Sequence, residues 1–192
     1  MNKKISDNSR VDPLKRIIKE IHRIDDHALW AVNGKISLQL QDVPCDADNT
    51  EITTRRDILK LLKDPSNQFI KSIKENISSP TAIQLSSNGH NFTIHGDPTI
   101  YGRYDSIKPT QIPSLWDALV SVHCENIIVL CTPIEWELLV AILTEKRESI
   151  DLLKKILSRR GYDSRLVVRL LREGRVDQET EENVWKTLES SI

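Results

Sequence analysis

The sequence predicts an α/β protein (α+β) in which helices flank a mixed, twisted sheet and a C-terminal helical extension follows. Within residues 27–54 the apolar periodicity changes twice, from strand to helix and back to strand. Two short alternating runs, at residues 81–86 and 91–95, indicate a hairpin because a four-residue turn segment separates them. From residue 133 onward the apolar residues recur at helical spacing.

The N-terminal region is expected to begin with a disordered segment, residues 1–11, and to continue as a helix. Asp12 and Pro13 supply an N-cap and a proline at the first helical position. An apolar stripe should form the inner face of this helix, which ends near Asp26. The stripe consists of Ile17, Ile18, Ile21 and Ile24.

The central stretch predicts a strand at residues 28–32, a turn at Asn33 and Gly34, a short helix, and a second strand at residues 49–54. A helix that begins at a glycine turn leaves free backbone N–H groups at its positive end. Such an end suits a phosphate, and Lys35 would add a mobile positive charge.

Between residues 54 and 132, helices and strands are expected to alternate. Thr54 is a candidate cap for a helix through Lys63, and the spacing of Phe69, Ile73 and Ile77 favours a further helix or an irregular crossing segment. Residues 97–113 are expected to form a long loop, residues 115–119 a short helix, and residues 127–131 a fully buried strand. The predicted N-terminal core comprises Trp30, Ile36, Leu38, Leu59, Leu62, Ile128 and Leu130.

Composition describes an ordinary globular protein of 192 residues, with 39% hydrophobic residues, 29% charged residues and a net charge of −1. The charge gives no global argument for nucleic-acid or membrane binding, and no apolar run is long enough to cross a bilayer. Three cysteines without a Cys-x-x-Cys pair favour a reduced, cytoplasmic setting. The sequence lacks a serine-hydrolase elbow, glycine-rich nucleotide motifs and histidines at zinc-ligand spacing.

The C-terminal helices carry a local excess of positive charge. Four acidic residues accompany ten cations between residues 146 and 175: Lys146, Arg147, Lys154, Lys155, Arg159, Arg160, Arg165, Arg169, Arg172 and Arg175. Such a surface could follow RNA or DNA phosphates. The alternative is a solvated helix face that the acidic segment 177–189 partly neutralises by folding back.

Several motifs occur in an order that resembles the minimal nucleotidyltransferase domains of the polymerase-beta-like superfamily. The stretch Trp30-Ala31-Val32-Asn33-Gly34-Lys35 is similar to the family opening Trp-Ala-Leu-Thr-Gly-Ser, and Leu40-Gln41-Asp42-Val43 to Leu-Gln-Gly-Val. Asn49-Thr50-Glu51 aligns with the family's Asp-x-Asp, and Thr93 with a third carboxylate. Residues 133–139 resemble the opening of the family's C-terminal helices, so the resemblance covers roughly residues 14–173.

The resemblance implies a nucleotidyltransferase-like α/β domain at residues 12–132 and a C-terminal helical region at residues 133–192. The implied nucleotide-binding residues are Gly34, Lys35, Asn49 and Thr93. Catalysis by two metals needs concentrated negative charge, but only Glu51 among the three aligned positions is a carboxylate. Asp48 and Asp97 are the candidates to assist Glu51 in catalysis, and Asp48 with Glu51 in metal binding.

A second way to restore the carboxylate pair is a shifted strand register that uses Asp46 and Asp48, although both residues also suit a solvated turn. His95, beside Gly96 and Asp97 at the end of the predicted strand 91–95, is either a general base or ligand, or a structural histidine.

Three hypotheses follow. The first is a catalytically degenerate nucleotidyltransferase-fold protein that binds a nucleotide, a nucleic acid or a protein partner. The second is an active, Mg²⁺-dependent enzyme that moves a nucleoside monophosphate from a triphosphate onto an RNA or protein hydroxyl. The third is an interaction module of a toxin–antitoxin or defence pair, which rests on the resemblance alone. None involves a membrane, and the oligomeric state is left open.

Overall fold

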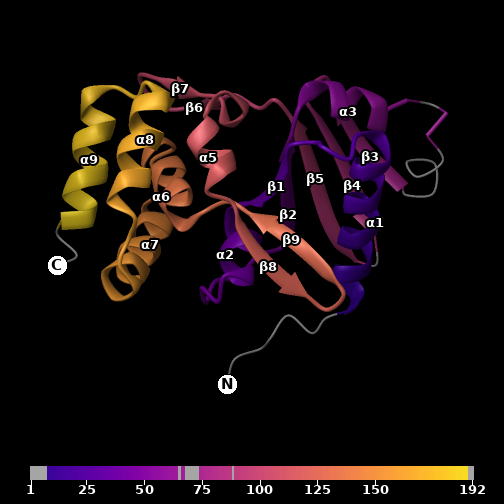
Figure 1. Cartoon of the computed structure of the whole chain (residues 1–192), viewed down its shortest axis with the longest axis horizontal. Helices are drawn as coiled ribbons and strands as arrows, with labels where there is room; N and C mark the ends of the chain where they lie inside the picture. Colours follow the sequence, from indigo (N-terminus) through magenta and orange to yellow (C-terminus); the bar gives the residue numbers. More distant parts are fainter. Residues whose placement is uncertain (1–7, 65, 68–73, 88, 190–192) are drawn as a thin grey trace. The chain divides into compact units, whose positions relative to one another are not determined.

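The computed structural model describes residues 8–64, 66–67, 74–87 and 89–189 (Figure 1). The chain forms two compact units: the first comprises Met1–Asp97 and Ser121–Cys131, and the second Pro98–Val120 and Thr132–Ile192. The domain boundaries expected from the sequence placed residues 98–120 in the N-terminal α/β domain. In the structure Pro98–Val120 belongs to the same unit as the C-terminal helices. None of the described helices is long and apolar enough to cross a membrane.

A mixed sheet organises the first unit. Among the described residues it has seven strands in the order β3-β4-β5-β2-β1-β9-β8. β2 runs parallel to β5 and β1 parallel to β9, whereas β1–β2, β3–β4 and β4–β5 are antiparallel. The strands are β1 (Trp30–Asn33), β2 (Asn49–Thr54), β3 (Lys74–Ser79), β4 (Ala82–Ser87), β5 (His90–Gly96), β8 (Val120–Cys124) and β9 (Ile127–Cys131).

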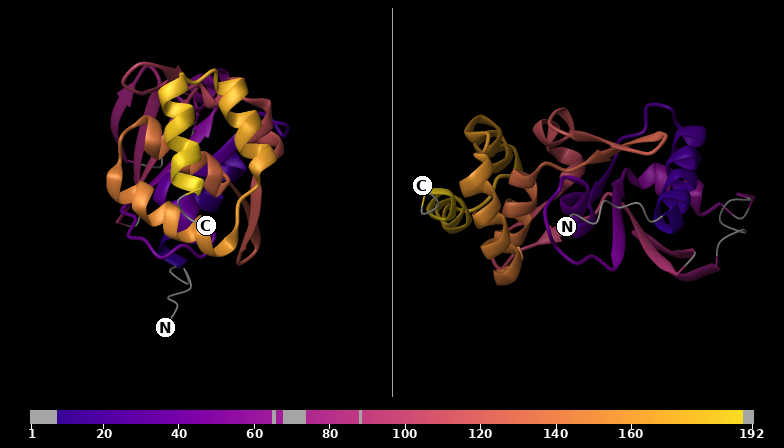
Figure 2. Two further views of the ribbon diagram at one scale, coloured as in Figure 1. Left: turned by 90° about the vertical axis from the view of Figure 1, so that its left-hand side faces the viewer. Right: turned by 90° about the horizontal axis from the view of Figure 1, so that it is seen from below.

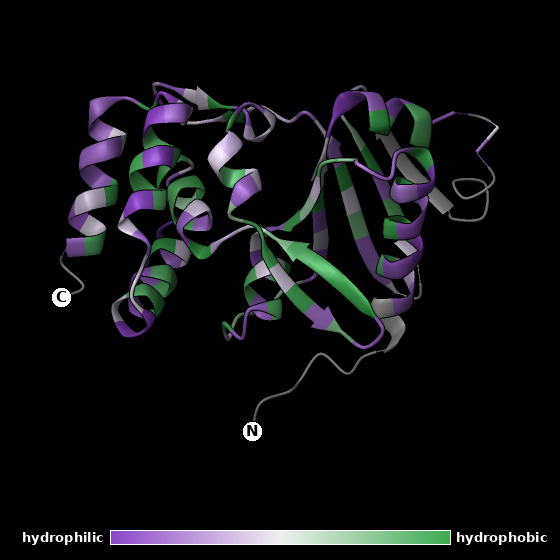
Figure 3. Cartoon of the chain, viewed as in Figure 1, coloured by the Kyte–Doolittle hydropathy of each residue, from purple (hydrophilic) through white to green (hydrophobic). Residues whose placement is uncertain are grey.

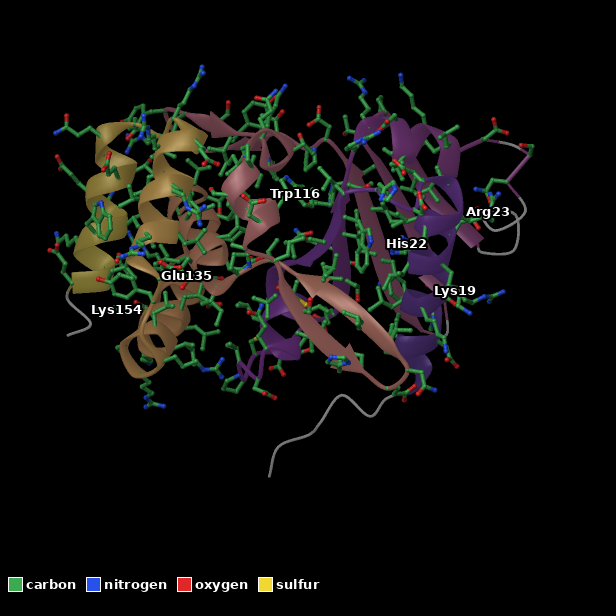
Figure 4. All side chains as sticks on the ribbon, in the orientation of Figure 1. Lys19, His22, Arg23, Trp116, Glu135 and Lys154 are labelled. Carbon is green, nitrogen blue, oxygen red and sulfur yellow. The ribbon has the colours of Figure 1, made fainter. Side chains whose placement is uncertain are left out.

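The helices of the first unit are α1 (Asn8–Ile24), α2 (Gly34–Leu40) and α3 (Arg56–Leu62). Helices α1 and α3 cover the apolar face of the sheet, where the strand register pairs Ile52 with Val32 on one side and with Ile94 on the other. The Trp30 indole Nε1 donates a hydrogen bond of 3.2 Å to His22 Nε2, so α1 is tied to β1 (His22 is labelled in Figure 4). The buried residues of this layer include Ile17, Ile21, Ile58, Leu59, Leu62, Ile83, Leu85 and Phe92.

Four long helices and a short hairpin build the second unit. Helix α6 lies at its centre and contacts α7, α8 and α9 (Figures 1 and 2). The Trp116 indole, labelled in Figure 4, donates a hydrogen bond of 2.9 Å to the Pro109 carbonyl. The elements are β6 (Ile100–Tyr101), β7 (Ser106–Ile107), the 3-10 helix η1 (Pro109–Gln111), α5 (Pro113–Asp117), α6 (Ile134–Leu143), α7 (Arg147–Arg160), α8 (Ser164–Gly174) and α9 (Gln178–Glu189).

Most elements expected from local sequence patterns are present. The strand–helix–strand order of β1, α2 and β2, the β4–β5 hairpin and the four C-terminal helices are confirmed. Strands β6, β7 and β8 were not expected, because each is short or lacks a run of apolar residues. Helix α1 begins at Asn8, so part of the segment expected to be disordered is helical; residues 1–7 lie outside the described residues.

The prediction of a fully buried strand at residues 127–131 is wrong. Val129 and Cys131 are buried, but Ile128 is 52% exposed and Leu130 is only half-buried. Strand β9 is apolar along its length (Figure 3), yet it places only alternate side chains against the core. Ile128 and Leu130 are therefore not core residues, whereas the other five predicted core residues are buried.

Two helix predictions also need correction. Residues 74–79, which include Ile77, form strand β3 rather than a helix; the earlier part of the predicted helix, residues 68–73, lies outside the described residues. Helix α3 begins at Arg56 without a side-chain cap. Thr54 does not cap it, because its hydroxyl donates a hydrogen bond of 2.7 Å to the Leu29 carbonyl.

The closest approach of α3 to the sheet depends on Gly96. A Cβ at this position would lie 2.6 Å from Leu59 Cβ and 3.2 Å from Arg56 Cα. We expect Gly96→Ala to lower the free energy of unfolding by about 1–3 kcal/mol, because the backbone of α3 must move away from β5. Urea titration measures the effect. Gln84→Ala, at an exposed position of β4, is the control and should change stability by less than about 0.5 kcal/mol.

Candidate functional site

The sheet of the first unit has a polar face opposite the face that α1 and α3 cover. Asn49, Glu51 and Thr53 alternate along β2 with the buried residues Thr50 and Ile52. Glu51 pairs with Thr93 in the register of β2 and β5, so these two side chains project from the same side of the sheet. The structure thus confirms that Asn49, Glu51 and Thr93 share one face.

Glu51 is held by a chain of hydrogen bonds across this face. Asn33 Nδ2 donates to Glu51 Oε2 at 3.3 Å, and Thr53 Oγ1 donates to Asn33 Oδ1 at 3.2 Å. The chain orients one carboxylate oxygen through a neutral amide. Sequence reasoning missed Asn33 and Thr53 as site residues, although Asn33 immediately precedes the glycine turn and Thr53 lies two residues beyond Glu51.

Asn49 and Thr93 form a second pair on the same face. Asn49 Nδ2 donates to Thr93 Oγ1 at 3.0 Å. The other amide atom, Asn49 Oδ1, is buried and has no hydrogen-bond partner among the described residues. An unsatisfied buried acceptor costs about 1–3 kcal/mol. This oxygen is therefore suited to accept a hydrogen bond from a bound molecule.

Gly34 brings the backbone close to Glu51 at the start of α2. Its φ of +72° lies in the left-handed region, and a Cβ there would be 3.5 Å from Glu51 Oε2. Lys35, the next residue, has an exposed side chain, and its carbonyl accepts a hydrogen bond from the Cys45 thiol at 3.4 Å. The turn and the carboxylate are thus neighbours, as the sequence predicts.

His95 belongs to the polar face as well, because it pairs with Thr53 in the register of β5 and β2. Burial lowers the pKa of His95 below its ordinary value of 6.5, and the negative charge of Glu51 acts in the opposite direction. The imidazole is therefore neutral at pH 7. It can accept or donate a hydrogen bond, but it adds no charge to the site.

The three aspartates proposed to assist Glu51 lie outside strands β2 and β5. Strand β2 begins at Asn49, so the shifted register through Asp46 and Asp48 is not used; both aspartates are exposed in the preceding loop. Asp97 follows the end of β5, where its N–H donates to the Thr54 carbonyl at 2.8 Å. Its backbone lies four residues, or about 13 Å, beyond the Glu51–Thr93 pair.

These residues do not fit a site for two divalent metals. Glu51 is the only carboxylate in β1, β2, β4 and β5, and its neighbours on the polar face are neutral. Within the described ranges no three His, Cys, Asp or Glu side chains are grouped so that they could hold a metal ion. Mg²⁺ is held through carboxylates and substrate phosphates, and one carboxylate cannot supply the charge for two ions.

Comparison with known proteins shows the fold. No protein-family model and no curated protein matches the sequence. The structure is similar to the crystal structure of a Thermotoga maritima protein that is provisionally named a nucleotidyltransferase, with a TM-score of 0.51 and 18% identity; the match covers 79% of this chain and 96% of that chain.

A second similar structure is the solution structure of the antibiotic-resistance factor ANT(2'')-Ia. The TM-score is 0.52 at 9% identity, and the match covers 96% of this chain and 93% of that chain. At these identities the likeness defines the fold alone. The chain is thus an α/β protein with a nucleotidyltransferase fold and a C-terminal helical extension.

The burial of His95 predicts a pH dependence of stability. Its pKa is lowered in the folded state, so at pH values below about 6.5 the unfolded chain binds a proton that the folded chain resists. The free energy of unfolding should therefore be highest above pH 6.5 and should fall as the pH decreases toward 5.

Denaturant titrations between pH 5 and 7.5 measure this slope. In His95→Gln the slope should flatten, whereas His27→Gln, at an exposed position, should keep it. Equal slopes in the wild type and in His95→Gln would show that His95 is not desolvated.

Proposed function

We propose that this protein is a catalytically degenerate nucleotidyltransferase-fold protein that binds a nucleotide on the polar face of its sheet. The observation that carries the proposal is the Asn49–Thr93 hydrogen bond. It joins two neutral side chains at the positions where the sequence resemblance implies carboxylates. Two neutral groups that bond to each other do not supply the negative charge that two divalent metal ions need.

The remaining groups are suited to hydrogen bonding with an uncharged part of a ligand. Glu51 accepts hydrogen bonds, Asn49 Oδ1 is a buried acceptor without a partner, and His95 is neutral at pH 7. A carboxylate beside amide groups can recognise ribose hydroxyls or the amino group of a base. The first ligand to test is therefore a nucleoside triphosphate, whose phosphates would lie beside the Gly34–Lys35 turn.

The sign of the Glu51→Gln effect separates this proposal from the active-enzyme alternative. Where no metal neutralises it, the charge of Glu51 repels the phosphates, and the amide oxygen of glutamine can still accept a hydrogen bond from the ribose. Glu51→Gln should therefore tighten nucleotide binding by roughly two- to tenfold. Where Glu51 holds a metal that bridges to the phosphates, the same substitution should weaken binding. Titration of the four labelled triphosphates with and without Mg²⁺ measures both cases.

Glu125→Gln serves as the control, because it removes an exposed carboxylate from the turn between β8 and β9. This variant should bind nucleotide as the wild type does. Nucleotide binding that requires Mg²⁺ and weakens in Glu51→Gln would contradict the degenerate site and favour the enzyme.

Restoring the two carboxylates should create a metal site. We expect Asn49→Asp combined with Thr93→Glu to bind Mn²⁺ at least tenfold more tightly than the wild type, because three carboxylates then converge on one face. Mn²⁺ binding is followed by electron paramagnetic resonance, and transfer by incubation with labelled triphosphates and RNA or protein acceptors. Thr93 is buried, so Asn49→Asp alone is measured too, in case the double variant does not fold.

Ser121→Asp combined with His123→Glu adds the same charge at two exposed positions of β8 and is the matched control. It should leave Mn²⁺ binding unchanged. Robust transfer by the wild type that disappears in Glu51→Gln would overturn the proposal.

A further inference from the structure

Strand β8 forms an open edge of the large sheet (Figure 1). Among the described residues its one neighbour in the sheet is β9, on the inner side. In the part of the chain that the structure describes, no residue of β8 has a backbone hydrogen bond outside this sheet. An edge strand presents a row of unpaired N–H and C=O groups, with which another strand can pair.

The turn between β8 and β9 determines which backbone groups point away from the sheet. It consists of Glu125 and Asn126, and the φ of Glu125 is +51°, as expected for the first central residue of a two-residue hairpin turn of type II′. The residues that flank such a turn exchange hydrogen bonds, and along an antiparallel pair the bonded positions alternate. Cys124 and every second residue before it therefore bond to β9. The N–H and C=O groups of Ser121 and His123 point to the open side.

Strand β8 lacks the residues by which edge strands commonly avoid pairing. Its sequence, Val-Ser-Val-His-Cys, contains no proline and no Asp, Glu, Lys or Arg. The opposite edge of the sheet differs in both sequence and geometry. Strand β3 begins with Lys74 and Glu75, and its pairing with β4 shifts register between Glu75 and Ile77. Charges and bulges of this kind protect an edge, so of the two edges β8 is the one open to pairing.

The side chains of β8 suit a partner strand without charge. Val120, Val122 and Cys124 are half-buried on one face, whereas Ser121 and His123 are exposed on the other. A strand added to this edge would bury the remaining surface of the two valines, which favours association through the hydrophobic effect. A charged partner residue would find no opposite charge on β8, so an uncharged, β-branched strand fits best.

An antiparallel second copy of β8 meets these requirements. When the two strands pair about a two-fold axis at Val122, Ser121 lies opposite His123 of the second copy. The two residues then exchange a pair of hydrogen bonds on each side of the axis, because their N–H and C=O groups point to the open side. Val122 lies opposite its own copy in a non-hydrogen-bonded pair, where side chains approach most closely. No like charges face each other, and two β-branched side chains pack together.

We propose that β8 pairs with β8 of a second copy of this chain, so that two sheets join into one across a two-fold axis at Val122. The contact is isologous, because each copy contributes the same strand. Two five-residue strands form a small interface, so the dimer is weak, with a dissociation constant of about 10–100 µM. The proposed nucleotide site lies on β2 and β5 of a single chain, so this inference does not depend on it.

Sedimentation equilibrium of the full chain, at concentrations from about 1 to 300 µM, measures the association. The average mass should rise from the 22.0 kDa of one chain toward twice that value as the concentration increases. A mass that stays at 22.0 kDa over the whole range would overturn the proposal. Growth beyond a dimer would overturn it too, because a two-fold contact through one strand is closed.

Ser121→Asp combined with His123→Glu should weaken the dimer at least tenfold, because carboxylates then lie directly opposite each other on both sides of the axis. Its Mn²⁺ binding stays unchanged, since the polar face of β2 and β5 belongs to one chain. Ser121→Lys combined with His123→Glu is the matched control: it places opposite charges across the axis and should keep the dimer. Equal weakening in the two variants would overturn the pairing. Both positions are exposed, and thermal unfolding checks that both variants remain folded.

Disulfide formation tests the position of the axis. Cα atoms of a non-hydrogen-bonded pair are about 4.5 Å apart, a distance that a disulfide can span. Val122→Cys should therefore give a covalent dimer on oxidation with diamide, and mass spectrometry should find the link between the two copies of position 122.

Ser121→Cys and the wild type are the controls for this link. The two copies of position 121 are diagonal neighbours about 7–8 Å apart, and Cys124 lies more than about 13 Å from its own copy. Both proteins should give little covalent dimer. As much covalent dimer from either control as from Val122→Cys would overturn the proposal.

Discussion

The parallel pairing of β2 with β5 is the constraint on which the first unit depends. Its register places Ile52 beside Ile94 on the face that α1 and α3 bury, and Glu51 beside Thr93 on the opposite face. Because side chains alternate along a strand, a slip of one residue would expose the isoleucines and bury the carboxylate. Core formation and construction of the polar site are thus consequences of the same register.

The polar face opposite the buried isoleucines carries little charge of its own. Carboxylates crowded on neighbouring strands repel each other unless a cation offsets their charge. Here the Asn49–Thr93 pair is neutral and internally hydrogen-bonded, and Glu51 is oriented by the Asn33 amide. The hydrogen bonds of this face therefore join neutral side chains to one another and to a single carboxylate. What remains is a face suited to hydrogen bonding rather than to charge neutralisation.

Local sequence patterns predicted helices and strands correctly where a single residue or a regular spacing of apolar residues determines the backbone conformation. Gly34 marked the turn before α2, and the helical spacing after residue 133 marked α6 to α9. These patterns failed where pairing with another strand, or packing against a distant segment, determines the secondary structure or the burial of a residue. Residues 74–79 are a strand because they pair with β4, and Ile128 is exposed because β9 presents only one face to the core. Neither the partner strand nor the open face can be read from a short apolar run.

The sequence by itself determined the alternation of Asn49 and Glu51 on one strand, the glycine turn that precedes them, and the neutral side chains at Asn49 and Thr93, because these follow from residue identity and a period of two. Only the tertiary structure decided which groups meet. It brought Asn33 to Glu51 and Thr53 to Asn33, and it placed Asp46 and Asp48 in the loop before β2 and Asp97 beyond the end of β5. Strand order and helix packing arise from contacts between distant segments, which no local pattern encodes.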